Sequence, residues 1–161
     1  MSAETPRPQR LGRLETVFVR SPIYFVTACT SNRRKILARS EIHESFIEFA
    51  KNGPEYGAWI GKYVLMPDHV HAFVALDDEK ITLASWMKSL KNSLSKTLRA
   101  EKISPPHWQK TFFDHVLRGA DSYTEKRHYV RENPVHPGLV KHWSEWPFLG
   151  EIFDLYFHDE R

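Results

Sequence analysis

The chain has 161 residues, of which 41% are apolar and 27% are charged, a composition typical of a single globular domain. No run approaches the roughly 20 apolar residues of a membrane span, and one cysteine alone cannot form an internal disulfide. We therefore expect a cytoplasmic protein without a membrane partner, and the net charge of +3 favours a polyanionic partner only weakly.

Composition along the chain predicts three segments. Residues 1–20 are predicted to be a flexible basic N-terminal arm, because residues 1–13 contain Pro, Arg, Gln and Gly without an apolar core. Residues 21–140 contain the periodic apolar patterns of a folded domain. Residues 141–161 are rich in aromatic residues, and we expect this C-terminal tail to pack on the domain.

Within the domain, β-branched and aromatic runs indicate strands, and apolar residues three or four positions apart indicate helices. In chain order the predicted elements are a strand at 23–30, a helix at 40–52, strands at 57–66 and 68–76, a helix at 83–100, a strand at 112–117 and a helix at 119–133. This order is that of a split βαβ fold, related to ferredoxin-like and RRM-like domains. The predicted class is α+β, with an antiparallel sheet, helices packed on one of its faces and a C-terminal extension.

Two histidines stand two residues apart in the strand predicted at 68–76. Because residues i and i+2 of a strand share a face, His69 and His71 can present two imidazoles to one divalent metal ion. The absence of a Cys-x-x-Cys pair argues against structural zinc. From the pair alone, a metal site and an ordinary buried pair both remain open. We expect Asp68 to point to the other face and to stabilise the turn.

The last predicted helix supplies candidate partners. Tyr129 and Asn133 are four residues apart and therefore share a helix face. The Asn133 amide could be a third ligand, and the Tyr129 phenol could attack a phosphorus atom whose oxygens the metal polarises. Taken alone, each residue has a simpler explanation: Tyr129 as a packed core tyrosine and Asn133 as a helix C-cap before a proline. Because Asn133 precedes a proline, we expect it at a frayed helix end.

Two motifs in this order resemble a known family. Met-Pro-Asp-His-Val-His at 66–71 resembles the His-hydrophobe-His (HUH) motif of single-tyrosine transposases. His-Tyr-Val-Arg-Glu-Asn-Pro-Val at 128–135, followed by Gly-Leu-Val at 138–140, resembles the Tyr-Ile-x-x-Asn-Pro-Val-x-x-Gly-Leu block of REP-associated tyrosine transposases. The resemblance covers about 24–140 and implies that 21–140 is an HUH single-tyrosine transposase domain.

The resemblance also implies chemistry. Tyr129 would be the nucleophile, and His69, His71 and Asn133 would hold Mg²⁺ or Mn²⁺, with no nucleotide cofactor. The implied reaction is cleavage and rejoining of single-stranded DNA beside a hairpin, through a 5′-phosphotyrosine intermediate, as in DNA transposition. Relatives are either monomers or dimers that exchange the tyrosine helix, and the aromatic tail favours a monomer here. Two alternatives are a domesticated protein that only binds structured DNA and a metal phosphodiesterase that uses water.

Basic residues outside these motifs are candidates for DNA backbone contacts. Several lie roughly along one face of the helix predicted at 83–100, and others follow the first strand. The candidates are Arg33, Arg34, Lys88, Lys91 and Arg99, together with the polar Asn92 on the same helix. An ordinary solvated helix face is the alternative for the helical ones.

Overall fold

The computed structural model describes residues 15–19 and 22–157, and its centre is a five-stranded antiparallel sheet. The strands occur in the spatial order β5-β2-β4-β3-β6. Their bounds are β2 Ile23–Cys29, β3 Ala58–Met66, β4 His69–Leu76, β5 Phe113–Leu117 and β6 Leu149–Glu151. The first four are the predicted strands, and their arrangement is that of the split βαβ fold. The predicted α+β class is confirmed.

Three helices pack on this sheet, each close to its predicted range. They are α1 Ser40–Asn52, α2 Leu83–Ala100 and α3 Ala120–Glu132. The start of α2 is fixed by Thr82, whose hydroxyl accepts a hydrogen bond from the Ser85 N–H at 3.1 Å. Among the described residues, no helix combines the length and apolar character that a membrane crossing requires.

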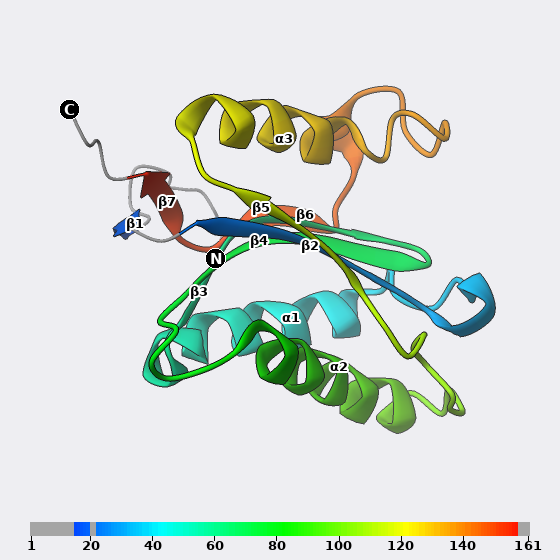
Figure 1. Ribbon diagram of the computed structural model, residues 1–161. Coiled ribbons are helices and arrows are strands. Elements are labelled where there is room, and N and C mark those ends of the chain that lie inside the picture. The colour runs from blue at the N-terminus through cyan, green and yellow to red at the C-terminus, as the bar shows by residue number, and fades with distance from the viewer. Residues whose placement is uncertain (1–14, 20–21, 158–161) are drawn as a thin grey trace, which may run out of the picture.

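The helices cover both faces of the sheet, which corrects the expectation that they share one face (Figure 1). Helices α1 and α2 lie together on one face, whereas α3 lies alone on the other. The physical reason is that β4 is apolar on both sides: its residues from Val70 to Leu76 are all buried. A strand of this kind requires cover on each face.

The packing accordingly forms two apolar clusters. The α1–α2 side contains Phe46, Leu90 and Leu94 over Val70 and Val74 of the sheet. On the opposite side, Tyr123 and Val130 of α3 pack with apolar sheet residues. Those sheet residues include Ile23, Phe25, Val64 and Phe73. The second cluster is the one that positions the candidate site.

The segments at the two ends of the domain form strands that the sequence patterns did not predict. In the N-terminal arm, residues 1–14 and 20 lie outside the described residues, whereas Thr16–Val19 forms β1 and pairs in parallel with β7, Asp154–Phe157. In the tail, β6 extends the sheet along β3, and the Trp146 indole donates a 3.0 Å hydrogen bond to the Leu65 carbonyl. Such short pairings depend on contacts distant in sequence rather than on a local pattern.

Leu94→Ala should lower the free energy of unfolding by about 2–5 kcal/mol, because it leaves a cavity in the α1–α2 cluster. Leu139→Ala is the matched control, because Leu139 is 45% exposed. Urea denaturation followed by circular dichroism measures both variants. Equal destabilisation by the two substitutions would contradict this assignment of the core.

Candidate functional site

His69 and His71 lie on the α3 side of the sheet. Phe73 follows His71 by two residues on β4 and therefore shares its face. It contacts Tyr123 of α3, with the ring centroids 5.2 Å apart. The two imidazole centroids are 4.7 Å apart, and the His71 ring stacks on Phe25 at 5.1 Å. The pair thus presents two nitrogen-bearing rings side by side beneath α3.

Each imidazole is oriented through its Nδ1 atom. His69 Nδ1 donates to Asp68 Oδ1 at 2.8 Å, and His71 Nδ1 lies 2.8 Å from the Thr27 hydroxyl. A histidine that uses Nδ1 in this way keeps the Nε2 lone pair for a metal, which is the usual arrangement of metal-bound histidines. Thr27 stands opposite His71 in the β2–β4 register. Only this long-range strand pairing identifies Thr27, and no local motif marks it.

Burial keeps the His71 ring neutral. Desolvation is the main cause that lowers the pKa of His71 to about 3, and the positive charges possible at His69 and Lys126 lower it further. The His71 imidazole therefore carries a free lone pair at neutral pH, as a metal ligand must.

Asp68 orients His69, which corrects the expectation that it would turn to the other face. Its carboxylate accepts from His69 and, through Oδ2, from the Arg33 Nε at 3.1 Å. Burial alone would raise the pKa of Asp68, but the hydrogen bonds from His69 and Arg33 lower it overall. Asp68 stands at the turn between β3 and β4, where the backbone does not follow the strand alternation used for the prediction.

Tyr129 lies next to the histidine pair of its own chain. Its ring centroid is 6.0 Å from that of His71 and 6.4 Å from that of Phe25, while the side chain is 44% exposed. Lys126, one helical turn earlier, places its Nζ 5.3 Å from the Tyr129 ring centroid. The i, i+3 spacing on a helix is the sequence signal that would have identified Lys126.

Asn133 follows Tyr129 by one turn and is 8% exposed. Its φ of −55° and ψ of −43° are helical, despite the proline that follows, and the next turn is held by a Val135 N–H to Glu132 carbonyl bond of 2.9 Å. Among the described residues, the buried Asn133 Oδ1 has no hydrogen-bond partner. A buried amide oxygen without a donor matches the requirement for a metal ligand.

The histidine pair needs such a third ligand. In the part of the chain that the structure describes, no group of three His, Cys, Asp or Glu side chains could hold a metal ion. The donors that the sequence predicts are two imidazoles and the amide oxygen of Asn133. These residues fit a divalent cation that accepts mixed nitrogen and oxygen ligands.

The predicted DNA contacts fall into two groups. Arg34 and Lys91 already bind backbone carbonyls: Arg34 donates to Ser104 and Pro106, and Lys91 donates to Gln109 and Thr111. These bonds hold the segment between α2 and β5 against the rest of the domain.

Other candidates are free to contact solvent. Lys88, Asn92 and Arg99 are exposed on α2, on the opposite side of the sheet from the histidine pair. Arg33 alone joins the site, through its ion pair with Asp68. DNA contact by any of these residues stays a prediction.

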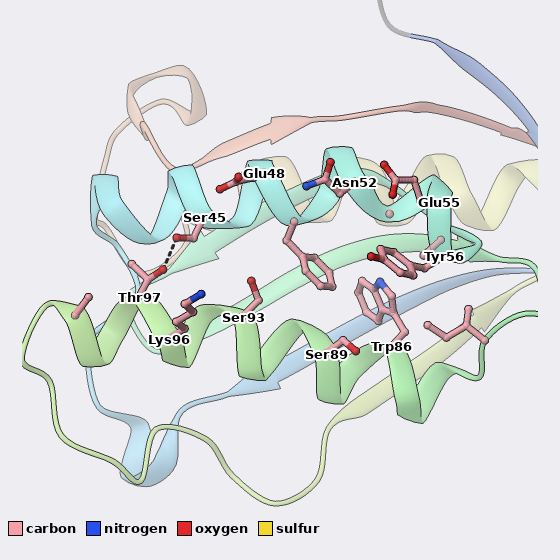
Figure 2. A pocket seen from close by; sticks show the side chains of 15 residues that line it. Ser45, Glu48, Asn52, Glu55, Tyr56, Trp86, Ser89, Ser93, Lys96 and Thr97 are labelled. Carbon is pink, nitrogen blue, oxygen red and sulfur yellow. Dashed lines mark hydrogen bonds between the residues drawn. The ribbon is translucent and has the colours of Figure 1, made fainter.

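A further cavity lies elsewhere in the described part of the molecule. It occupies about 770 Å³ between α1 and α2, and Figure 2 shows Tyr56 and Trp86 among its lining side chains. A hydrogen bond between the Ser45 and Thr97 hydroxyls joins the two helices at one end. None of the predicted catalytic or metal-binding residues lines this cavity, so its size alone does not make it the reaction site.

A protein-family match gives the class of enzyme in which His69, His71 and Tyr129 stand. The family model described as "Transposase IS200 like" matches residues 19–133. The chain belongs to this transposase family. It is 27% identical to a REP-associated tyrosine transposase of Escherichia coli (strain K12), over 81% of this chain and 77% of the relative.

A solved structure supports the fold. A REP-associated tyrosine transposase bound to a REP hairpin matches with a TM-score of 0.67 and 23% identity, over 92% of this chain and 82% of the solved one. The resemblance drawn from the two motifs is thereby confirmed, and the chain is an enzyme of a family that acts on DNA.

Asp68→Asn should lower the free energy of unfolding at pH 7 by about 1 kcal/mol, because a neutral amide accepts more weakly from His69 and Arg33. Because folding lowers the pKa of Asp68, its ionised form stabilises the fold above the unfolded pKa near 3.8. The difference from wild type should therefore vanish as pH falls through the folded-state pKa. Urea titrations between pH 2.5 and pH 7 test this, with the exposed Asp78→Asn as control. A difference that persists in acid would contradict the assignment.

Proposed function

We propose that this transposase cleaves and rejoins single-stranded DNA flanking a hairpin through a 5′-phosphotyrosine on Tyr129. The observation that carries the proposal is the position of the Tyr129 ring, 6.0 Å from the His71 ring of the same chain. In the reaction, the Tyr129 oxygen forms a bond to phosphorus and the bond to the 3′-oxygen breaks. The phenol loses a proton and the departing 3′-hydroxyl gains one, so one phosphodiester is exchanged without a nucleotide cofactor.

The proposed metal ligands are His69, His71 and Asn133. A bound Mg²⁺ or Mn²⁺ would supply Lewis acidity that polarises the scissile phosphate. Asp68 and Thr27 hold the two imidazoles through Nδ1, which presents Nε2 as the ligand atom. The unpartnered Asn133 oxygen supports its place in this set.

The surroundings of Tyr129 suit the charge that it gains. Lys126 carries a positive charge within 5.3 Å of the ring centroid and also approaches Phe25 at 5.4 Å. A nearby cation stabilises the negative oxygen that a phenol develops as it attacks. The exposed phenol leaves room for a DNA strand to reach it.

The proposed partner is hairpin DNA, and the proposed active unit is a monomer. The relative of known structure is a REP-associated tyrosine transposase bound to a REP hairpin. Because Tyr129 and the histidine pair meet within one chain, no exchange of α3 between subunits is needed to assemble the site.

Tyr129→Phe should abolish formation of a covalent protein–DNA adduct, because it removes the attacking oxygen while keeping the ring. The measurement is a denaturing gel of protein incubated with Mn²⁺ and a hairpin oligonucleotide carrying single-stranded flanks. Tyr56→Phe is the control, since Tyr56 is 63% exposed at the α1–α2 cavity. A water-using phosphodiesterase would still cleave after Tyr129→Phe, and a domesticated binder would show no cleavage as wild type. Either result would refute the proposed reaction.

Asn133→Leu should weaken Mn²⁺ binding by about tenfold or more without lowering the free energy of unfolding. Removing a ligand reduces metal affinity, whereas replacing an unpaired buried oxygen by apolar atoms is neutral or stabilising. Isothermal titration with Mn²⁺ and thermal unfolding without metal measure the two effects. Asn133→Asp is the matched variant that keeps an oxygen ligand and should retain binding. Destabilisation with unchanged Mn²⁺ affinity would show a structural role only.

A further inference from the structure

A basic cavity lies on the flank of α3 that faces away from Tyr129. It occupies about 210 Å³, several times the roughly 30 Å³ share of one water molecule. The lining residues are Lys62, Thr124, Arg127, His128 and Arg131, so no carboxylate lines it. Arg127 and Arg131 are four residues apart and therefore neighbours on the helix.

The cations of this cavity are incompletely paired. Arg127 is 3.6 Å from Glu151 and Lys62 is 4.0 Å from it, both longer than a hydrogen bond. The Nε atoms of Arg127 and Arg131 are buried, and neither donates a hydrogen bond among the described residues, although the Arg131 Nε lies 3.7 Å from the Glu132 carboxylate. Burial also lowers the pKa of Lys62, because desolvation disfavours its ammonium form. Buried donors without acceptors destabilise a fold unless a ligand satisfies them.

The aromatic neighbours hold the two guanidinium groups in place. The Arg131 Cζ lies 5.0 Å from the Trp143 ring centroid, and the Arg127 Cζ lies 5.2 Å from that of Tyr123. Arg131 also donates to His128 Nδ1 at 3.1 Å. Stacked arginines of this kind are well suited to phosphate, whose oxygens accept from the planar fork.

We propose that this cavity binds a phosphate of the DNA backbone, distinct from the phosphate that Tyr129 attacks; the proposal rests on the proposed function. Tyr129 and the arginine pair occupy opposite flanks of one helix, whose diameter with side chains is about 10–12 Å. A DNA strand lying across α3 can therefore contact both flanks. The arginine pair would hold the strand in register while its neighbouring phosphate reaches the phenol.

The test is the salt dependence of hairpin DNA binding, measured by fluorescence anisotropy with the non-cleaving Tyr129→Phe protein. Adding Arg131→Gln or Lys62→Gln should weaken binding about tenfold. Each should also reduce the slope of log K against log salt by about 0.7–0.9, the value for one lost phosphate contact. Arg131→Lys should keep most of the slope, because it keeps the charge.

Two further variants keep the result interpretable. Thr124→Glu places a carboxylate at the exposed rim of the cavity without touching its packing, and it should weaken DNA binding as well. Lys51→Gln removes one exposed charge from α1, on the other side of the sheet, and should leave the slope unchanged. An equal loss of slope with Lys51→Gln would overturn the proposal, since it would show a general charge effect.

Other outcomes separate the possible ligands. Inorganic phosphate that raises the melting temperature of wild type but not of Arg131→Gln, with DNA binding unaffected, would overturn the assignment to DNA. An unchanged slope in Arg131→Gln and Thr124→Glu, while wild type still forms the adduct, would overturn this site alone. A reduced slope without any adduct would refute the proposed reaction and uphold the phosphate site.

Discussion

The packing of α3 on the sheet is the contact on which the rest of the site depends. Two buried residues of this helix, Tyr123 and Val130, join the apolar cluster beneath it. They lie seven residues apart, two helical turns, so they form a narrow strip along the helix. This strip fixes the rotation of α3, and rotation decides which side chains reach each flank. Tyr129 is thereby directed towards β2 and β4, where Phe25 and His71 lie, and Arg127 towards Glu151 on β6.

The same apolar cluster determines the electrostatics of the histidine pair. His71 stacks on Phe25 and is nearly buried, so its charged form is strongly disfavoured. His69 is closer to solvent and contacts the ionised Asp68, which Arg33 holds in turn. The inner imidazole, His71, is therefore neutral, whereas the outer one, His69, hydrogen-bonds to the ion pair between Asp68 and Arg33. A cation bound between the rings would face little competition from protons at His71, which is what metal binding at neutral pH requires.

Patterns of neighbouring residues in the sequence predicted the helices and the central strands, because these elements are determined mainly by residues close together in the chain. The periodic apolar runs gave α1, α2 and the four central strands, and strand alternation placed His69 beside His71. The position of α3 was predicted wrongly, because β4 buries residues on both of its faces and each face therefore requires cover. The orientation of Asp68 was predicted wrongly because it depends on a turn, and Thr27 was missed because its contact with His71 depends on strand register. Strands β1, β6 and β7 are short and are specified by distant partners, so no local run could predict them.

Buried polar atoms without a hydrogen-bond partner occur at both of the positions on α3 for which a function is proposed. Among the described residues, the Asn133 Oδ1 accepts no hydrogen bond and the Nε atoms of Arg127 and Arg131 donate none, although the Arg131 Nε lies 3.7 Å from the Glu132 carboxylate. A buried polar group that is left without a partner destabilises a fold by about 1–3 kcal/mol. In the proposed complex, DNA phosphates would accept hydrogen bonds from the arginines, and a bound metal ion would coordinate the amide oxygen. Tyr123 and Val130 bury α3 against the sheet along a narrow strip. DNA binding would therefore add contacts that stabilise the position of this helix. Binding energy gained at the arginine flank would then be used to fix Tyr129 at the scissile phosphate.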